Sequence, residues 1–320
     1  MILPLIKSYL AKEINAMTTQ LATVSAANIQ PVIDLVTNAV TSQHTKRAYA
    51  RALTDFMVWY QANGQSGLSK ATVQAHVSAL RAAGVSASSI NQRLTAIRKL
   101  ALEAADNGMI DHSAAQAIGR AEGVRSEGKR LGNWLTVEQS QTLINLPDVS
   151  TLKGLRDRAI LAALLGCGLR REECAGLLVE HIQQREGRWV IVDLLGKRSK
   201  LRSVPMPSWA KAAIDAWLNG AGITSGPVFV STRRGGHVQG AGMTAQAIFD
   251  VVKLYAKQIG VDVRPHDLRR TFAKLAHKGK APLEQIQMSL GHASIQTTER
   301  YLGVSQDLQS APCDVLGLRI

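Results

Sequence analysis

The stretch RPHDLRRTFAKLAHKG, residues 264–279, predicts a helix with one apolar face and two chemically active side chains. Pro265 suits the first helical turn, and apolar residues recur behind it at three- and four-residue spacing. His266 and Arg269 lie three positions apart, so a helix stacks them on one face. A proton carrier that titrates near neutral pH and a permanent, forked cation therefore point to the same place.

Two further segments bring more groups of this kind. Downstream, LGHASIQTTERYLGV (residues 290–304) places His292 directly after a helix-ending glycine and Tyr301 nine residues later. Upstream, GCGLRREECAGL (residues 166–177) sets Arg170 just past a glycine-rich turn. Taken singly, each of these residues would most often be a packing or surface group. The evidence for a functional site is therefore their occurrence together.

Between these segments the sequence predicts a β-hairpin. The apolar and β-branched runs 189–195 and 201–206 flank the basic turn GKRSK, which contains Lys197 and Lys200. Helical patterns surround the hairpin near residues 153–165, 207–219, 243–259, 265–278 and 282–290. The second half of the chain is therefore predicted to be mainly α with a small β-sheet.

The first half predicts a small helical bundle over residues 41–120. Thr41 or Ser42 caps a first amphipathic helix and Ser69 caps a second, while a third carries apolar residues through 90–104. The third helix has basic residues away from its apolar stripe, namely Arg93, Arg98 and Lys99. Such charges are usually a solvated face, but they also suit phosphate contacts.

A glycine- and charge-rich segment without apolar periodicity, GRAEGVRSEGKRLG (residues 119–132), predicts an exposed linker. The expected organisation has four parts: an N-terminal extension of uncertain structure 1–40, the helical domain 41–120, the linker 121–132 and a second domain 133–320. Whether residues 1–16 belong to the native start stays open.

Composition favours a polyanionic partner. The 320 residues include 38 Lys and Arg against 24 Asp and Glu, a formal charge of +14. No apolar run reaches the about 18 residues that span a bilayer, so we expect no membrane partner. Three cysteines without paired spacing fit a reducing cytoplasm, and we see neither a nucleotide-binding glycine loop nor a metal-ligand cluster. No cofactor and no metal are predicted.

Together these segments resemble the signature boxes of the tyrosine recombinases, the phage integrase family, and the chain is Xer-like. Arg170 stands in the family's GLR-x-x-E-x-x-x-L context, which Glu173 completes, and HxLRxT, LGH and TTxRY boxes follow in order. The family's catalytic residues fall on Arg170, Lys197, His266, Arg269, His292 and Tyr301. Lys200 is a fallback for Lys197, because the alignment of the turn could slip by a few residues.

The resemblance implies a fold and a chemistry. The fold is an N-terminal core-binding, SAM-like helical bundle, whose first helix Thr45 to Phe56 fits, plus a C-terminal α+β catalytic domain. Two arginines would stabilise the charge that builds on a DNA phosphate, and Tyr301 would attack it to form a 3′-phosphotyrosyl link. His266 would take the phenol proton and Lys197 would protonate the leaving 5′-oxygen. Neither ATP nor metal is then required.

The implied partner is double-stranded DNA with an inverted-repeat recombination site, on which the chain would assemble as a tetramer in the cytoplasm, associated with the nucleoid. Thr45, Arg93, Arg98 and Lys99 are candidate DNA contacts of the bundle. Two alternatives stay open: a type IB topoisomerase-like relaxing enzyme, which shares the cleavage step, and a non-catalytic DNA-binding protein. The target sequence, and the choice between integration, excision, transposition and dimer resolution, cannot be predicted.

Overall fold

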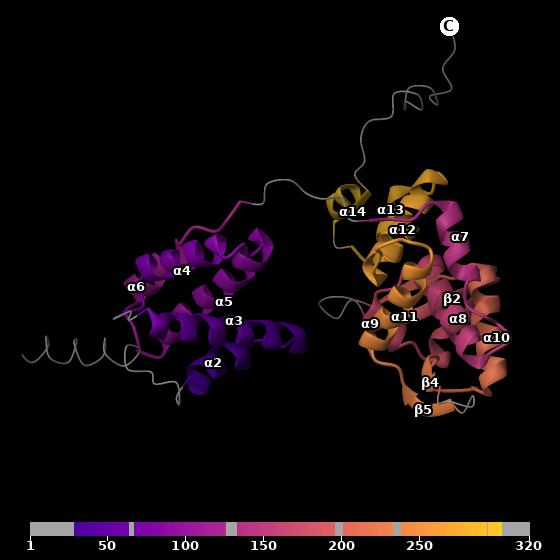
Figure 1. Ribbon diagram of the computed structural model, residues 1–320, viewed down its shortest axis with the longest axis horizontal. Coiled ribbons are helices and arrows are strands. Elements are labelled where there is room, and N and C mark those ends of the chain that lie inside the picture. Colours follow the sequence, from indigo (N-terminus) through magenta and orange to yellow (C-terminus); the bar gives the residue numbers. More distant parts are fainter. Residues whose placement is uncertain are drawn as a thin grey trace, which may run out of the picture. The chain divides into compact units, whose positions relative to one another are not determined.

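The computed structural model describes residues 29–63, 67–125, 133–195, 201–232, 238–292 and 294–302. The predicted catalytic Lys197 and its fallback Lys200 lie outside these ranges, and only the backbone of Tyr301 is described. The chain divides into two compact units, residues 1–129 and 130–320. It is mainly helical with small antiparallel sheets, which confirms the predicted fold class (Figure 1).

The N-terminal unit is a bundle of helices that begin where hydroxyl side chains cap them. Its helices are α2 (Ile29–Asn38), α3 (Gln43–Ala62), α4 (Lys70–Ala82), α5 (Ala87–Asp106) and α6 (His112–Gly119). Ser42, Ser69 and Ser86 each accept a hydrogen bond from the backbone N–H three residues on, at the starts of α3, α4 and α5. The caps predicted at Ser42 and Ser69 are confirmed.

Helix α2 belongs to this bundle, although residues 1–40 were expected to be an extension of uncertain structure. Ile33 and Val36 on α2 are buried in one core with Leu53, Phe56 and Ile97. Helix α2 packs against α3 and α5. The bundle therefore begins before residue 41, because the apolar face of α2 is covered by residues that lie far from it in sequence.

Residues 121–125 also pack on the bundle, so the predicted exposed linker begins later than expected. The side chain of Gln74 makes two hydrogen bonds with the backbone of Glu122, one as donor and one as acceptor. The side chain of Asn91 makes the same pair with the backbone of Val124, and both of these bonds are 2.9 Å long. Ala121 is buried in the core. The remaining linker residues, 126–132, lie outside the described residues.

The second unit surrounds a central helix, α8 (Leu152–Cys167), which is buried along nearly its whole length. Helix α7 (Val137–Asn145) precedes it and starts with a reciprocal capping box between Thr136 and Gln139. The elements that follow α8 are α9 (Arg171–Ala175), η2 (Val179–His181), β1 (Ile182–Arg185), β2 (Arg188–Leu195), β3 (Leu201–Pro205), α10 (Ser208–Ala221), β4 (Val230–Thr232), β5 (Val238–Gly242), α11 (Ala245–Gln258), α12 (Pro265–Lys278), α13 (Leu283–Leu290) and α14 (Ile295–Leu302).

The predicted hairpin is present as β2 and β3 of an antiparallel sheet in the order β1-β2-β3. Ile191 pairs with Val204, and both are fully buried against the core around α8. Strands β4 and β5 form a second small sheet that the sequence did not predict. The pairing of β2 with β3 fixes which face of β3 turns inward, and this face carries part of the site.

None of the helices in the described ranges has both the length and the apolar character needed to cross a membrane.

Candidate active site

A tight turn places Arg170 between α8 and α9. Gly168 ends α8 in the left-handed conformation, with φ +58°, and an added Cβ would lie 2.7 Å from a ring carbon of Phe272 on α12. Only glycine fits both the backbone conformation and this contact. Two residues later, Arg170 caps the start of α9, where its guanidinium can reach the C-terminal helices.

Glu173 closes this turn by binding Arg170 twice. The backbone N–H of Arg170 donates to Oε2 of Glu173 at 2.8 Å, and Nη1 of Arg170 donates to Oε1 at 2.6 Å. Arg170 is the N-cap of α9 and Glu173 lies in its first turn, so the carboxylate satisfies an otherwise unpaired N–H at the helix start. Glu173, which completes the sequence motif around Arg170, therefore holds both the backbone and the side chain of that arginine.

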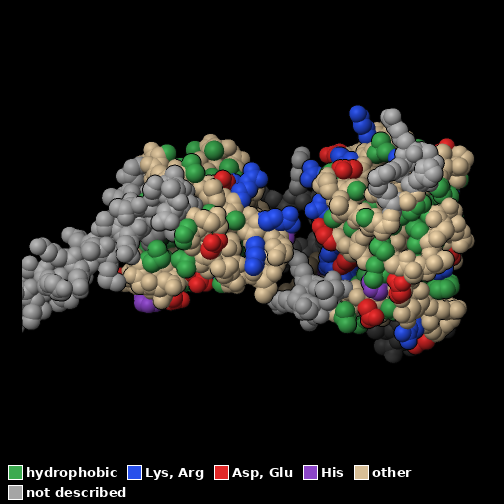
Figure 2. All heavy atoms as spheres, turned by 90° about the horizontal axis from the view of Figure 1, so that it is seen from below, with side chains coloured by type: hydrophobic (Ala, Val, Ile, Leu, Met, Phe, Trp, Pro, Cys, Tyr) green, Lys and Arg blue, Asp and Glu red, His purple; other side chains and the backbone are tan. Residues whose placement is uncertain are grey.

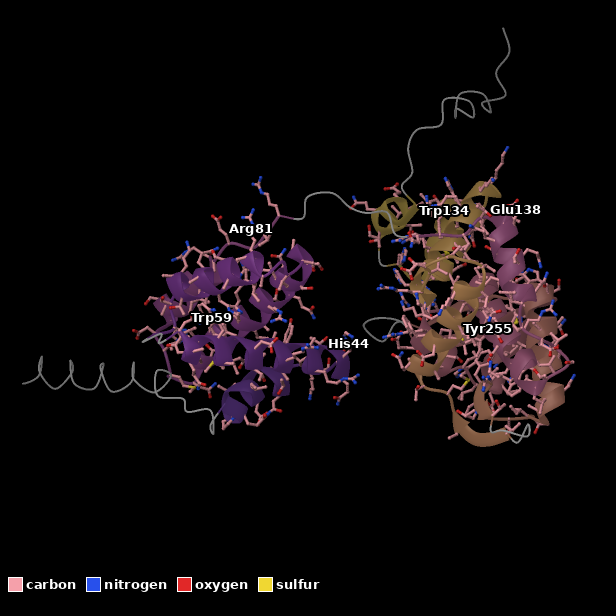
Figure 3. The ribbon with its side chains drawn as sticks, viewed as in Figure 1. His44, Trp59, Arg81, Trp134, Glu138 and Tyr255 are labelled. Carbon is pink, nitrogen blue, oxygen red and sulfur yellow. The ribbon has the colours of Figure 1, made fainter. Side chains whose placement is uncertain are left out.

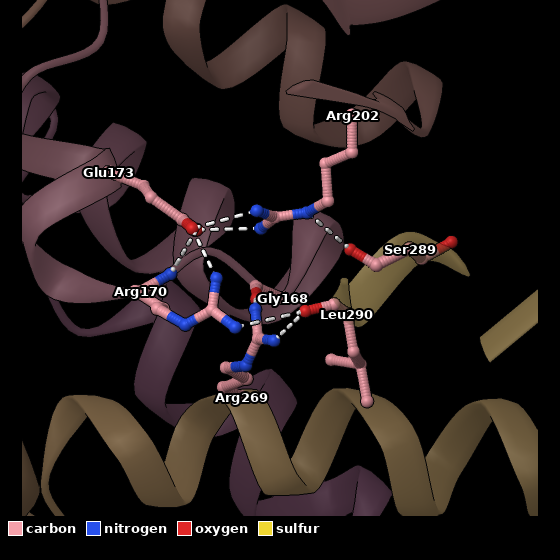
Figure 4. Close-up of polar contacts among 7 residues, drawn as sticks. All are labelled: Gly168, Arg170, Glu173, Arg202, Arg269, Ser289 and Leu290. Atoms are coloured by element: carbon pink, nitrogen blue, oxygen red, sulfur yellow. Dashed lines mark hydrogen bonds and ion pairs between the residues drawn. The ribbon is translucent and has the colours of Figure 1, made fainter. Parts of the chain in front are cut away.

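Arg269 converges with Arg170 on one backbone carbonyl (Figure 4). Arg269 on α12 is only 1% exposed. Its Nη1 donates to the Gly168 carbonyl at 2.6 Å and its Nη2 donates to the Leu290 carbonyl, which also accepts from Nη2 of Arg170 at 3.3 Å. The structure thus brings together two arginines that are far apart in the sequence.

Arg202 is a third arginine of this cluster, and it was not predicted from the sequence. From β3 its Nη1 and Nη2 donate to the two carboxylate oxygens of Glu173 at 2.8 and 2.7 Å, and its Nε donates to the Ser289 carbonyl at 3.1 Å. A signal was present: strand alternation puts Arg202 on the same face as the buried Val204. An inward-facing arginine needs an acidic partner, which distant parts of the chain supply.

The charge of Glu173 is fixed by its two arginines. Burial alone would raise the pKa of the Glu173 carboxyl, but hydrogen bonds from Arg202 and from the Arg170 backbone, with the charges of both guanidinium groups, lower this pKa to about 2. Glu173 is therefore ionised at neutral pH. It offsets part of the positive charge that the arginines bring to the site.

Both predicted site histidines are held in the neutral form. Desolvation, followed by repulsion from Arg270 and Arg269, lowers the pKa of His266 at the start of α12. Desolvation, followed by repulsion from Arg269 and Arg170, lowers the pKa of His292 to about 4. A neutral imidazole can accept a proton or share a hydrogen bond with an anion, so both rings suit a site that handles a phosphate ester.

Helix α14 places the backbone of Tyr301 beside this cluster. Nδ1 of His292 lies 2.9 Å from Oγ1 of the buried Thr298, which stands three residues before Tyr301 on α14. Leu302 packs in one apolar cluster with Leu290, whose carbonyl meets the two arginines. The helix that carries Tyr301, the predicted nucleophile, therefore lies next to the arginine cluster.

A pocket of about 300 Å³ opens beside the cluster. It is lined by side chains from α9, α11 and the start of α12, namely Arg170, Arg171, Glu172, Phe249, Arg264, Pro265 and His266. The lining includes Arg170, one of the two predicted catalytic arginines, and His266, the predicted proton acceptor. Three arginines in its wall favour an anionic occupant.

The basic residues predicted to contact DNA from the bundle each have a partner within their own unit. Arg93 pairs with Asp55 at 2.8 Å, Lys99 lies 3.6 Å from Glu103, and Arg98 donates to the Ala121 carbonyl. Thr45 lies in the first turn of α3, where its backbone N–H donates to the Ser42 cap. Lys and Arg side chains gather on one edge of this unit (Figure 2). DNA contacts by the four residues stay predictions.

Among the described residues, no group of three or more His, Cys, Asp or Glu side chains is placed to hold a metal ion.

A helical N-terminal domain and a C-terminal unit that gathers arginines, histidines and a tyrosine-bearing helix define a tyrosine recombinase. The chain belongs to the phage integrase family: the family model matches residues 133–307, and the model of the family's N-terminal SAM-like domain matches residues 32–108. The resemblance stated from the sequence motifs is confirmed.

Named relatives agree with this assignment. Tyrosine recombinase XerC of Xylella fastidiosa strain M23 is 34% identical over 268 residues, covering 81% of this chain and 86% of the relative. Tyrosine recombinase XerD of Pseudomonas aeruginosa is 29% identical over 291 residues, covering 86% and 93%. The chain is accordingly a site-specific recombinase, the function favoured from sequence over the topoisomerase-like and non-catalytic alternatives.

Solved structures share the fold. The XerH recombinase bound to a palindromic difH substrate after cleavage has a TM-score of 0.68 at 19% identity, covering 89% of this chain and 82% of that one. A lambda integrase dimer bound to a core site also has a TM-score of 0.68, at 15% identity, covering 92% and 82%.

Proposed function

We propose that this recombinase cleaves and rejoins double-stranded DNA at an inverted-repeat site through a 3′-phosphotyrosyl link to Tyr301. The observation that carries the proposal is the convergence of Arg170 and Arg269 on the Leu290 carbonyl, directly before His292 and α14. Guanidinium donors that already meet at one oxygen are preorganised for another oxygen that carries negative charge. A scissile phosphate placed there gains more from them as its charge rises.

In the proposed reaction, Oη of Tyr301 attacks the phosphorus and the bond to the 5′-oxygen breaks. The phenol proton passes to the neutral His266, and the leaving 5′-oxygen takes a proton from Lys197, with Lys200 as the fallback donor. Arg170 and Arg269 stabilise the two charges on the non-bridging oxygens, and His292 donates a hydrogen bond to one of them. Attack by a 5′-hydroxyl from a second duplex reverses these steps and joins the strands without ATP or metal.

A tetramer on DNA completes the proposal. The solved relatives include a recombinase on a palindromic substrate and an integrase dimer on a core site, which supports a site made of two inverted half-sites. Exchange between two such duplexes requires four subunits. We place this assembly on the bacterial nucleoid in the cytoplasm, because DNA is the substrate.

A nicked suicide substrate tests the nucleophile. The wild-type chain should form a denaturation-resistant adduct that retains the strand 5′ of the break, because the phosphate stays on the 3′ end. Tyr301→Phe should abolish the adduct and retain binding in a gel shift. Tyr49→Phe, a matched change in the bundle, should leave the adduct unchanged. An adduct formed by Tyr301→Phe would show that another residue attacks.

A further inference from the structure

Arg202 joins three segments of the second unit that are distant in sequence. It lies on β3, its carboxylate partner Glu173 lies on α9, and its carbonyl partner Ser289 lies near the end of α13. Figure 4 shows the carboxylate of Glu173 bound by both Arg202 and Arg170. The side chains of Arg202 and Glu173 are only 9% and 8% exposed. Screening by solvent is therefore weak in this ion pair.

The fit around Arg202 is close. Gly291 follows α13 with φ +60°, and an added Cβ there would lie 2.8 Å from Cδ of Arg202. All three guanidinium nitrogens of Arg202 donate to Glu173 or Ser289. Each guanidinium nitrogen of Arg202 therefore already donates to a protein acceptor, at a site that is proposed to bind a phosphate as well. Its geometry suits a supporting contact better than a direct one.

We propose that Arg202 is a positioning residue that keeps Arg170 available to the scissile phosphate. Glu173 binds Arg170 at 2.6 Å, and a carboxylate paired with Arg170 alone would compete with the phosphate for its charge. By forking onto both oxygens of Glu173, Arg202 shares that negative charge and fixes the orientation of the carboxylate. This inference rests on the proposed role of Arg170 as a phosphate ligand.

The test compares two DNA substrates: one with an ordinary scissile phosphodiester, and one with a methylphosphonate at the same position. The methylphosphonate is neutral, so attack builds one negative charge on it instead of two, and the need for Arg170 should relax. Arg202→Gln should slow adduct formation roughly 10- to 100-fold on the phosphodiester and only about 3-fold on the methylphosphonate. Arg170→Ala should show the same pattern with a larger loss.

Three companion variants sharpen the comparison. Arg202→Lys keeps the charge but cannot fork onto both oxygens, so it should lie between wild type and Arg202→Gln. Adding Arg202→Gln to Arg170→Ala should cause no further loss, because the two residues act as one unit. Arg188→Gln, which removes an exposed arginine from the same sheet, should match wild type on both substrates.

Equal losses on the two substrates, or losses that add to those of Arg170→Ala, would overturn the positioning role. If Arg202→Gln fails to fold, as its thermal denaturation will report, Arg202→Lys is judged by the same ratio of rates. The proposed function fails separately, if the wild-type chain forms no adduct on the phosphodiester or if Arg170→Ala is not relieved by the methylphosphonate.

Discussion

Arg269 in the second unit is buried and Arg98 in the bundle is half-buried, and both donate to backbone carbonyls. Arg269 binds the carbonyls of Gly168 and Leu290, and the second of these is shared with Arg170. Arg98 binds the carbonyl of Ala121, a residue of the segment that follows the last helix of the bundle. The contacts of Arg269 hold its guanidinium within a cluster of other site groups. The contact of Arg98 instead attaches the segment after α6 to α5 within the bundle.

The difference shows what a charged position in a sequence does and does not predict. Both arginines lie on predicted helices, and both suited a phosphate contact. Arg269 stood in a motif with His266, and further boxes added a second arginine and a tyrosine in a fixed order. Arg98 belonged to no motif, and only the net positive charge of the chain favoured a DNA contact for it. Net charge identifies the kind of partner, but a set of groups is needed to locate chemistry.

Arg269→Ala should give the largest effect. The variant removes a buried cation aimed at the site, so adduct formation on a nicked substrate should fall by about 10² to 10³ or more. Arg269→Lys should recover little, because an ammonium cannot bridge two carbonyls in a fixed fork. Single-turnover rates at saturating protein measure this loss separately from binding. A loss below tenfold would make Arg269 a structural arginine like Arg98.

Arg98→Ala should act on stability and spare the chemistry. Its removal leaves the Ala121 carbonyl without this donor, and such a loss costs about 1–3 kcal/mol. Hydrogen exchange should rise in α5, α6 and residues 121–125, while the cleavage rate on bound DNA stays within about twofold of wild type. Arg81→Ala, an exposed arginine at the end of α4, is the matched control. A strong cleavage defect would break the comparison.

Features encoded by neighbouring residues were predicted from the sequence, and contacts between distant segments were not. Local signals succeeded: serine caps and apolar spacing predicted α3 and α4, and motif order predicted that Arg170, His266 and His292 belong together. Contacts made across long sequence distances were missed. Arg202 needs acceptors 29 and 87 residues away, and α2 is defined by its packing against α3 and α5. No local pattern encodes such partners, since they exist only once the chain has folded.

Each unit contains a histidine whose pKa is lowered, His76 in the bundle and His292 in the second unit, so both can make stability depend on pH. Burial, followed by repulsion from Arg93, lowers the pKa of His76 to about 4 from an ordinary 6.5. His76 packs against Phe56 and Trp59, a residue that lies within the bundle (Figure 3), and neither of its ring nitrogens has a hydrogen-bond partner among the described residues.

Unfolding therefore takes up a proton at His76 between pH 6.5 and about 4, so the stability from the neutral ring is complete above pH 6.5 and is lost as the pH falls. The melting temperature of the full chain should drop between pH 7 and pH 5, and His76→Leu should reduce that drop. His44→Gln, at the exposed start of α3, should not. An equal drop in wild type and His76→Leu would assign the acid sensitivity to the second unit, where His292 shares the lowered pKa.

The smallest effect should come from Lys99, one of the cations on α5 that were predicted to contact DNA. Its pairing with Glu103 at 3.6 Å joins two partly exposed groups, so Lys99→Gln should change stability by no more than about 0.5 kcal/mol. If Lys99 contacts a phosphate, the slope of log affinity against log salt should become shallower by about one unit, and Glu103→Gln should tighten binding. Lys70→Gln, an exposed lysine on α4, controls for net charge. An unchanged slope would mean that Lys99, like Arg98, serves its own unit, and that the DNA contacts of the bundle come from other residues.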